Sequence, residues 1–220
     1  MATVRHVVTG LFVLAAMTAS LHADAPSRYR EHAMGDQLAD VLARTSARPA
    51  DVRTLHERPA LLQSLEWHRP YSSHDEAPDP VKTVTFAFVD GQLYQLTVDY
   101  DRMRVGGLTT ADLLKGVETV YGPRQATGTP PPIPPGSPAG TVMLGHWTDA
   151  EASVMLLRGP YEDLRLVVRS NALGDQAQRA MASAISQDAL EAPARRTAAK
   201  AAEAAALQDE RTKNRTAFKP

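Results

Sequence analysis

The chain has 220 residues, of which 43% are hydrophobic and 22% charged, a composition typical of one globular domain with appendages and not of a disordered chain. Its 24 basic and 25 acidic residues leave a formal net charge of −1, so no global basic field exists to gather nucleic acid or anionic lipid. The lack of cysteine excludes disulfides, thiolate metal sites, cysteine nucleophiles and a lipid-modified amino-terminal cysteine.

The first 23 residues have the pattern of a secretory signal peptide. Basic Arg5 and His6 precede an apolar stretch, 7–19, which is too short to span a bilayer, and small residues then provide a cleavage site. We expect cleavage after Ala23, with Ala25 as the alternative and an uncleaved anchor disfavoured by length. The mature chain is therefore predicted to be periplasmic or secreted, with no integral membrane span.

Residues 24–69 carry weaker patterns. Leu38, Val41 and Leu42 share one face of a helix predicted over 35–45, with Asp36 as its cap. Segment 52–56 fits a helix or a strand. Segment 61–69 also fits both, and we favour a strand over 63–68 because prolines at 59 and 70 bracket it and a strand there would extend a sheet.

Residues 81–100 predict the antiparallel hairpin around which the chain is organised. Large apolar residues occupy the even positions on both sides of Asp90-Gly91. These positions share a face only if opposed residue numbers sum to an even value, so we expect a three-residue loop, Val89-Asp90-Gly91, in place of a two-residue Asp-Gly turn. The predicted pairs are Phe88 with Gln92, Phe86 with Tyr94, and Val84 with Leu96.

The clearest helix is predicted over 108–122. Thr109 can cap it together with Asp112, an apolar stripe follows at helical spacing, and Gly122-Pro123 ends it. We expect this helix to cover one face of the sheet. The proline-rich loop 127–140 then serves as a spacer or, alternatively, as a docking segment for an aromatic groove.

Three further strands are predicted over 142–147, 153–158 and 164–169, followed by a helix over 172–191. Pro193 is expected to break that helix. The tail 194–220 is alanine-rich and locally basic, and we expect a solvated, partly frayed extension there, with contact to an acidic envelope component as the alternative.

Histidines supply the candidate site residues: His56, His68, His74 and His146. His74 lies beside the carboxylates of the polar segment 71–80, six residues after His68, but no spacing typical of a metal site is present, so this segment is interpreted as a solvated acidic loop. His146 has no evident orienting partner for catalysis. We therefore assign no catalytic, cofactor-binding or metal residues.

Most of the mature chain, roughly 29–191, resembles a family of uncharacterised exported bacterial proteins. The residues that carry the resemblance are Tyr29-Arg30-Glu31 with Gly35, Arg58-Pro59-Ala60-Leu61-Leu62-Gln63 with Leu65-Glu66-Trp67, Asp79-Pro80-Val81, the hairpin, Tyr100-Asp101, Gly107-Leu108-Thr109 and Tyr121-Gly122. The element order is similar, much more weakly, to the small lipoprotein of the outer-membrane barrel-assembly machinery and to β-lactamase-inhibitor-like folds. The chain lacks that lipoprotein's anchoring cysteine, and the family implies no activity.

The sequence thus predicts an α+β fold: an antiparallel sheet built around the 81–100 hairpin, helices packed on one face, and a C-terminal helical tail. The expected organisation is a signal peptide (1–23), an α+β domain (24–171) and a C-terminal helix with an Ala-rich charged tail (172–220). Two functions follow as hypotheses. The first is a non-catalytic envelope module that binds another protein or has a structural role; the alternative is a periplasmic hydrolase or small-ligand binder using His56, His68, His74 or His146.

Overall fold

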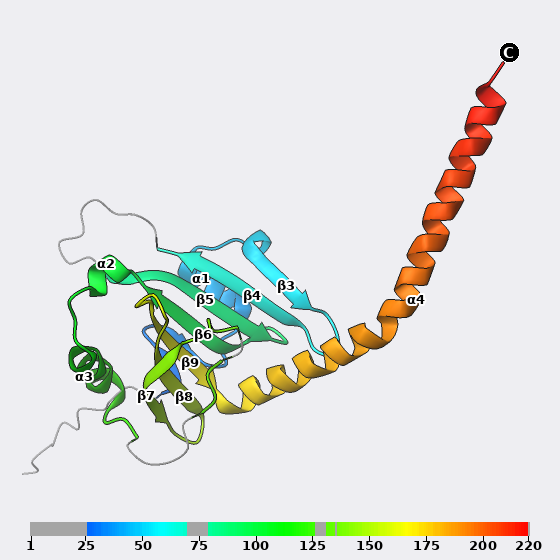
Figure 1. Ribbon diagram of the computed structural model, residues 1–220. Helices are drawn as coiled ribbons and strands as arrows, with labels where there is room; N and C mark the ends of the chain where they lie inside the picture. Colours follow the sequence, from blue (N-terminus) through cyan, green and yellow to red (C-terminus); the bar gives the residue numbers. More distant parts are fainter. Residues whose placement is uncertain (1–25, 70–78, 126–130, 135, 220) are drawn as a thin grey trace, which may run out of the picture.

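The computed structural model describes residues 26–69, 79–125, 131–134 and 136–219. The predicted signal peptide, His74, most of the acidic loop and part of the proline-rich loop lie outside these residues. The described chain forms an α+β fold with one seven-stranded antiparallel sheet and a long C-terminal helix (Figure 1). The fold class predicted from the sequence is therefore confirmed.

The sheet is antiparallel throughout and has the 81–100 hairpin at its centre. In spatial order its strands are β3 (Val52–His56), β4 (Leu62–His68), β5 (Val81–Val89), β6 (Gln92–Tyr100), β9 (Leu164–Ser170), β8 (Ala152–Arg158) and β7 (Val142–Thr148). The ambiguous segment 52–56 is a strand, and the other predicted strands are confirmed. A separate two-stranded hairpin, β1 (Arg28–Tyr29) and β2 (His32–Ala33), precedes them.

The central hairpin differs from the predicted one in its turn and register. Asp90 and Gly91 alone form the loop, with φ angles of 50° and 79°, as a two-residue turn with both central residues left-handed requires. Val89 therefore faces Gln92, and the predicted three-residue loop is wrong. The change of parity comes from a β-bulge, because Phe88 pairs with Leu93 and Ala87 with Gln95, which leaves Tyr94 as the extra residue.

Beyond the bulge the even-numbered residues do share a face, but they are paired differently from the prediction. Phe86 lies opposite Leu96, and Val84 opposite Val98. All four side chains are buried, and they belong to the main core. Tyr94 points instead to the other face, where it packs with Leu62, Val89 and α4.

Two helices cover the main core face of the sheet. α1 (Leu38–Thr45) packs through fully buried Val41, and α3 (Thr110–Tyr121) packs through Leu113, Leu114 and Val117. A 3₁₀ turn, η1 (Pro49–Asp51), and a four-residue helix, α2 (Arg102–Val105), connect elements at the surface.

The predicted caps are confirmed in one helix and wrong in the other. At α3, the Thr109 hydroxyl accepts the Asp112 amide at 3.2 Å and the Asp112 carboxylate accepts the Thr109 amide at 2.9 Å. At α1, the N-cap is Gln37, which makes no side-chain cap bond. The Asp36 carboxylate instead accepts the Ala33 amide at 2.9 Å and forms an ion pair with Arg44, so it fixes the turn that precedes the helix.

The C-terminal helix α4 (Asn171–Ala217) is continuous, so the predicted break at Pro193 is wrong. Figure 1 shows that α4 changes direction partway along its length, and a proline inside a helix is a usual cause of such a bend. Arg195 donates hydrogen bonds to the carbonyl and the carboxylate of Asp188, at 3.1 and 2.8 Å, across the proline. These bonds and the helix-forming residues on either side keep the two segments joined.

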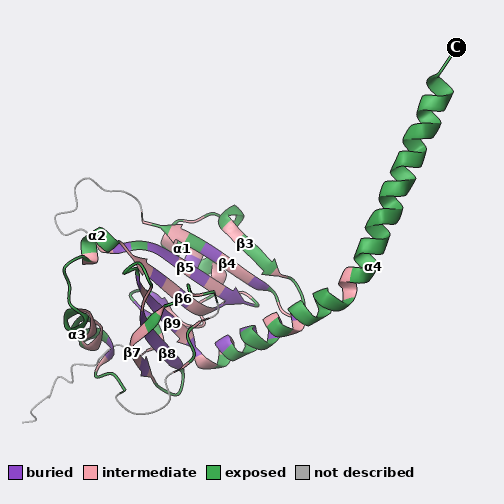
Figure 2. Ribbon diagram, in the orientation of Figure 1, coloured by how far each residue is buried: buried purple, intermediate pink, exposed green. Residues whose placement is uncertain are grey.

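The two segments of α4 have opposite environments. The first turns lie against the sheet face that carries Tyr94, and their small residues Gly174, Ala177, Ala180 and Ala184 are buried. From Pro193 onward every described residue is exposed, as the green ribbon in Figure 2 shows. We call residues 194–217 the projecting helix.

Candidate binding cleft

The structure does not bring the candidate histidines together. His56 ends β3 and faces Leu62, whereas His68 ends β4 six residues further on, about 20 Å away at 3.3 Å per residue. His146 lies in β7, the strand at the opposite edge of the sheet. His74 is not among the described residues.

The described candidate histidines have separate local settings. His68 has its Nδ1 3.3 Å from the Thr83 hydroxyl and its Nε2 3.3 Å from Glu66, and it lines a cavity of about 390 Å³. His56 lines a smaller polar cavity beside α4. Within the described ranges, no group of three or more His, Asp or Glu residues could hold a metal ion.

His32 is a buried histidine that the sequence analysis did not single out. Its side chain is 8% exposed, its ring meets Phe86 edge-on at 4.8 Å between centroids, and its Nδ1 has no hydrogen-bond partner. Burial lowers the pKa of His32, and the positive charge of Arg44 lowers it further. Strands of two residues are too short to show a periodic pattern, so nothing in the local sequence indicated this burial.

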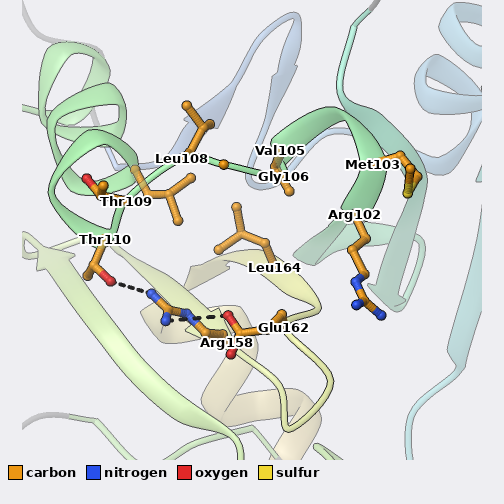
Figure 3. A pocket seen from close by; sticks show the side chains of 12 residues that line it. Arg102, Met103, Val105, Gly106, Leu108, Thr109, Thr110, Arg158, Glu162 and Leu164 are labelled. Carbon is orange, nitrogen blue, oxygen red and sulfur yellow. Dashed lines mark hydrogen bonds and ion pairs between the residues drawn. The ribbon is translucent and has the colours of Figure 1, made fainter.

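Two cavities that contain none of the described candidate histidines are lined by residues of α3. One cavity of about 640 Å³ lies between α2, the 106–109 link, the start of α3 and the turn between β8 and β9. Figure 3 shows Arg102 from α2 on one side, Arg158 and Thr110 on the other, and Leu164 between them. We call this the outer cavity.

Charges line the outer cavity unevenly. Arg158 donates to the Thr110 hydroxyl and lies 3.5 Å from the Glu162 carboxylate. Arg102 is exposed and makes no hydrogen bond or ion pair with any residue that the structure describes. Two guanidinium groups thus face a single carboxylate, which leaves this cavity with a surplus positive charge.

A second cavity, of about 460 Å³, lies between α3, the β1–β2 hairpin and the core face of the sheet. Its lining is mostly leucine, valine and tyrosine. It shares four of its lining residues with the outer cavity: Val105, Leu108, Leu113 and Leu164. We call it the inner cavity, and the two cavities together the α3 cleft.

Three tyrosines line one end of the inner cavity. The Tyr121 hydroxyl donates to the Arg28 carbonyl at 2.9 Å, and the side chains of Tyr29 and Tyr100 are hydrogen-bonded to each other. Burial raises the pKa of Tyr100 well above its usual value and raises that of Tyr29 as well. The hydroxyls of Tyr29 and Tyr100 therefore stay protonated at neutral pH and act as neutral polar groups.

An ion pair fixes the β1–β2 turn that forms one wall of the inner cavity. Both terminal nitrogens of Arg30 donate to the Asp79 carboxylate, at 2.7 and 2.8 Å, and the guanidinium lies 5.3 Å from the centre of the Tyr29 ring. The hydrogen bond from Arg30 lowers the pKa of Asp79 and raises that of Arg30. Both groups are therefore charged at neutral pH.

The cleft persists because α3 does not pack closely along its whole length. Gly116 stands in its middle, and a Cβ atom built there would meet nothing within 4 Å. Leu113 and Val117 are only half-buried, and Val120 and Leu108 are exposed. The sequence predicted the helix and its apolar stripe, and Gly116, an exposed residue that lines the inner cavity, was the one local signal of space beside the helix.

None of the described helices is both long enough and apolar enough to cross a membrane. Comparisons with family models, with curated proteins and with solved structures found no match to this chain. A proposal for its function therefore depends on the geometry of its own surfaces: the α3 cleft and the projecting helix.

Proposed function

We propose that the protein is an exported, non-catalytic module that binds another protein of the bacterial envelope, and that the projecting helix is its binding surface. The signal-peptide pattern of residues 1–23 supports export. His68 contacts the Thr83 hydroxyl and the Glu66 carboxylate, but the side chains of His68 and Glu66 are 69% and 62% exposed, and a pair that lies largely in solvent supports a non-catalytic role. The exposure of the projecting helix is the observation that carries the proposal.

An isolated alanine-rich helix is only marginally stable in water, and most helices in proteins gain their stability from packing. The projecting helix has no such packing in the monomer, since all its residues are exposed. A partner that packs along it would supply the missing contacts. This supports a role in binding, and not in the stability of the domain.

The charges of this segment favour an acidic partner. Residues 194–220 carry seven basic and three acidic side chains, although the whole chain has a net charge of −1. At 3.6 residues per turn, four of the cations fall within about 100° of arc around Leu207. These are Arg196, Lys200, Arg211 and Arg215. A protein surface rich in carboxylates complements this basic face.

Crosslinking in intact cells tests the proposal. The tagged full-length protein, a chain ended after Ala192 and the double variant Lys200→Glu/Arg211→Glu are compared. We expect one envelope protein to be crosslinked to the full-length chain, and to be lost from the truncated chain and the double variant.

The matched control is Lys213→Glu/Lys219→Glu, which changes the charge equally but lies outside the basic face. It should keep the partner. Crosslinking of the same partner to the truncated chain would refute the projecting helix as the binding surface. Loss of crosslinking in both double variants would mean that net charge, and not the basic face, determines binding.

The alternative function, a hydrolase or ligand site built from His56, His68, His74 or His146, has less support. The three described histidines lie on three different strands and share no cavity. The observation that does favour a small ligand is the α3 cleft, which contains none of the four.

A further inference from the structure

The inner cavity offers a surface suited to a hydrocarbon chain. Its floor consists of Leu156, Leu164 and Leu166 from β8 and β9, and its roof of Leu113 and Val117 from α3. Its volume of about 460 Å³ falls within the range of small-molecule sites, roughly 300–1,000 Å³. An apolar group placed there would leave water at about 25 cal/mol per Å² of buried surface.

The backbone around this cavity argues against a peptide as its occupant. β8 and β9 are interior strands, each hydrogen-bonded on both sides, and the roof is a helix whose amides bond within it. A peptide chain would bury amide groups without hydrogen-bond partners, which is unfavourable. A hydrocarbon chain has no such groups.

The outer cavity favours an anionic group at one end of that chain. Arg102 and Arg158 face it against Glu162 alone, and the Thr110 hydroxyl holds Arg158 in place. At the inner cavity the charges are already matched, because Arg30 pairs with Asp79 and the Asp112 carboxylate caps α3. The distribution of charge therefore favours a ligand whose anionic end lies in the outer cavity and whose apolar end lies in the inner cavity.

We propose that the α3 cleft binds a single-chain anionic amphiphile of the fatty-acid class. Its hydrocarbon chain lies in the inner cavity beneath α3, and its acid group lies in the outer cavity between Arg102 and Arg158. This site is independent of the projecting helix and of whatever partner that helix binds.

Equilibrium dialysis of the full-length protein with radiolabelled dodecanoate, below its micelle concentration, tests the proposal. We expect saturable binding at one site per chain. Gly116 lines the inner cavity and a Cβ atom there meets nothing within 4 Å, so we expect Gly116→Leu to narrow the cavity and to weaken binding at least tenfold. Replacing glycine by leucine favours a helix, so loss of binding cannot be attributed to unfolding.

A matched control is Ala111→Leu, which adds a similar side chain to an exposed position of α3 that does not line the cleft. It should bind dodecanoate as the parent protein does. Equal weakening by both variants, or binding unaffected by Gly116→Leu, would overturn the placement of the chain.

The acid group is tested separately with Arg102→Gln. Binding of dodecanoate should weaken about three- to tenfold, whereas binding of uncharged dodecanol should not change, because an exposed ion pair contributes less than a buried one and an alcohol forms no ion pair. Arg104→Gln, on the same helix but outside the cleft, is the control. No saturable binding of dodecanoate by the parent protein would refute the proposal as a whole.

Discussion

Both segments of α4 are rich in alanine, but they differ in charge and lie in opposite environments. Small residues of the first segment are buried against Leu62, Val89 and Tyr94, whereas the alanines of the projecting helix are all exposed. Both segments contain many helix-forming residues, but the first also carries Leu173 and Met181, which pack on the sheet, whereas the second has Leu207 as its one large apolar residue. The comparison teaches that packing on the domain is confined to the first segment of this helix, and that the second segment leaves its whole described surface exposed.

The largest effect is expected in the core to which the first segment is joined. Phe86→Ala should lower the free energy of unfolding by about 3–5 kcal/mol, because Phe86 is 1% exposed and its truncation leaves a cavity opposite Leu96. Urea unfolding measures it. Lys82→Ala, at an exposed position of the same strand, should change stability by less than about 0.5 kcal/mol, and an equal loss in both variants would contradict a buried hairpin face.

The same substitution in the two segments tests the comparison directly. Ala177→Leu should lower the free energy of unfolding by about 1–3 kcal/mol, because Ala177 is 2% exposed between α4 and the sheet and larger side chains overpack such a site. Ala201→Leu in the projecting helix should stay within about 0.5 kcal/mol of the parent. Similar losses at both positions would mean that the projecting helix packs on the body in solution.

His32 gives the domain a pH dependence. The pKa of His32 is lowered in the folded state, so below about pH 6.5 the unfolded chain binds more protons than the folded one. The contribution of neutral His32 to the free energy of unfolding should therefore be fully present above about pH 6.5 and decrease as the pH falls below that value. One such proton contributes a slope of at most about 1.4 kcal/mol per pH unit. Urea unfolding from pH 7.5 to 5 measures it, and His32→Gln should have the shallower profile. Identical profiles would contradict burial of a neutral imidazole.

The smallest effect is expected from ending the chain after Ala192. Because the removed residues are exposed, the free energy of unfolding of the remaining domain should change by less than about 0.5 kcal/mol, as measured by urea unfolding followed by tryptophan fluorescence. A loss above about 1 kcal/mol would show that the projecting helix supports the domain. That outcome would also weaken the proposed role of this helix in binding.

The strands and the helix at 110–121 were predictable because their patterns are local. Alternation identified β5, β6 and β9, the bracketing prolines favoured β4, and the Thr109–Asp112 spacing identified the cap of α3. The hairpin shows the limit of such reasoning: parity required one extra residue, but the same parity results whether it lies in the loop or at Tyr94. Packing of Tyr94 against α4 favours the second solution, and that contact joins residues distant in the sequence.

The candidate site was less predictable than the fold. Sequence reasoning selected histidines by residue type, but the arrangement of β3, β4 and β7 separates those that the structure describes. The α3 cleft is formed by residues that are distant in the sequence, such as those at positions 29, 100, 121 and 158. Local periodicity does not predict that these positions lie close together. Only Gly116, an unusual residue inside a helix, carried a local sign of it.

The length of the projecting helix determines how far its end lies from the bend in α4. With 24 residues at about 1.5 Å each, residues 194–217 extend roughly 36 Å beyond the bend in α4, comparable to the diameter of a small domain (Figure 1). A partner held near its end need not touch the sheet or the mouth of the α3 cleft. The two proposed binding events can therefore vary independently, and the bend in α4 sets the direction in which the projecting helix points from the domain.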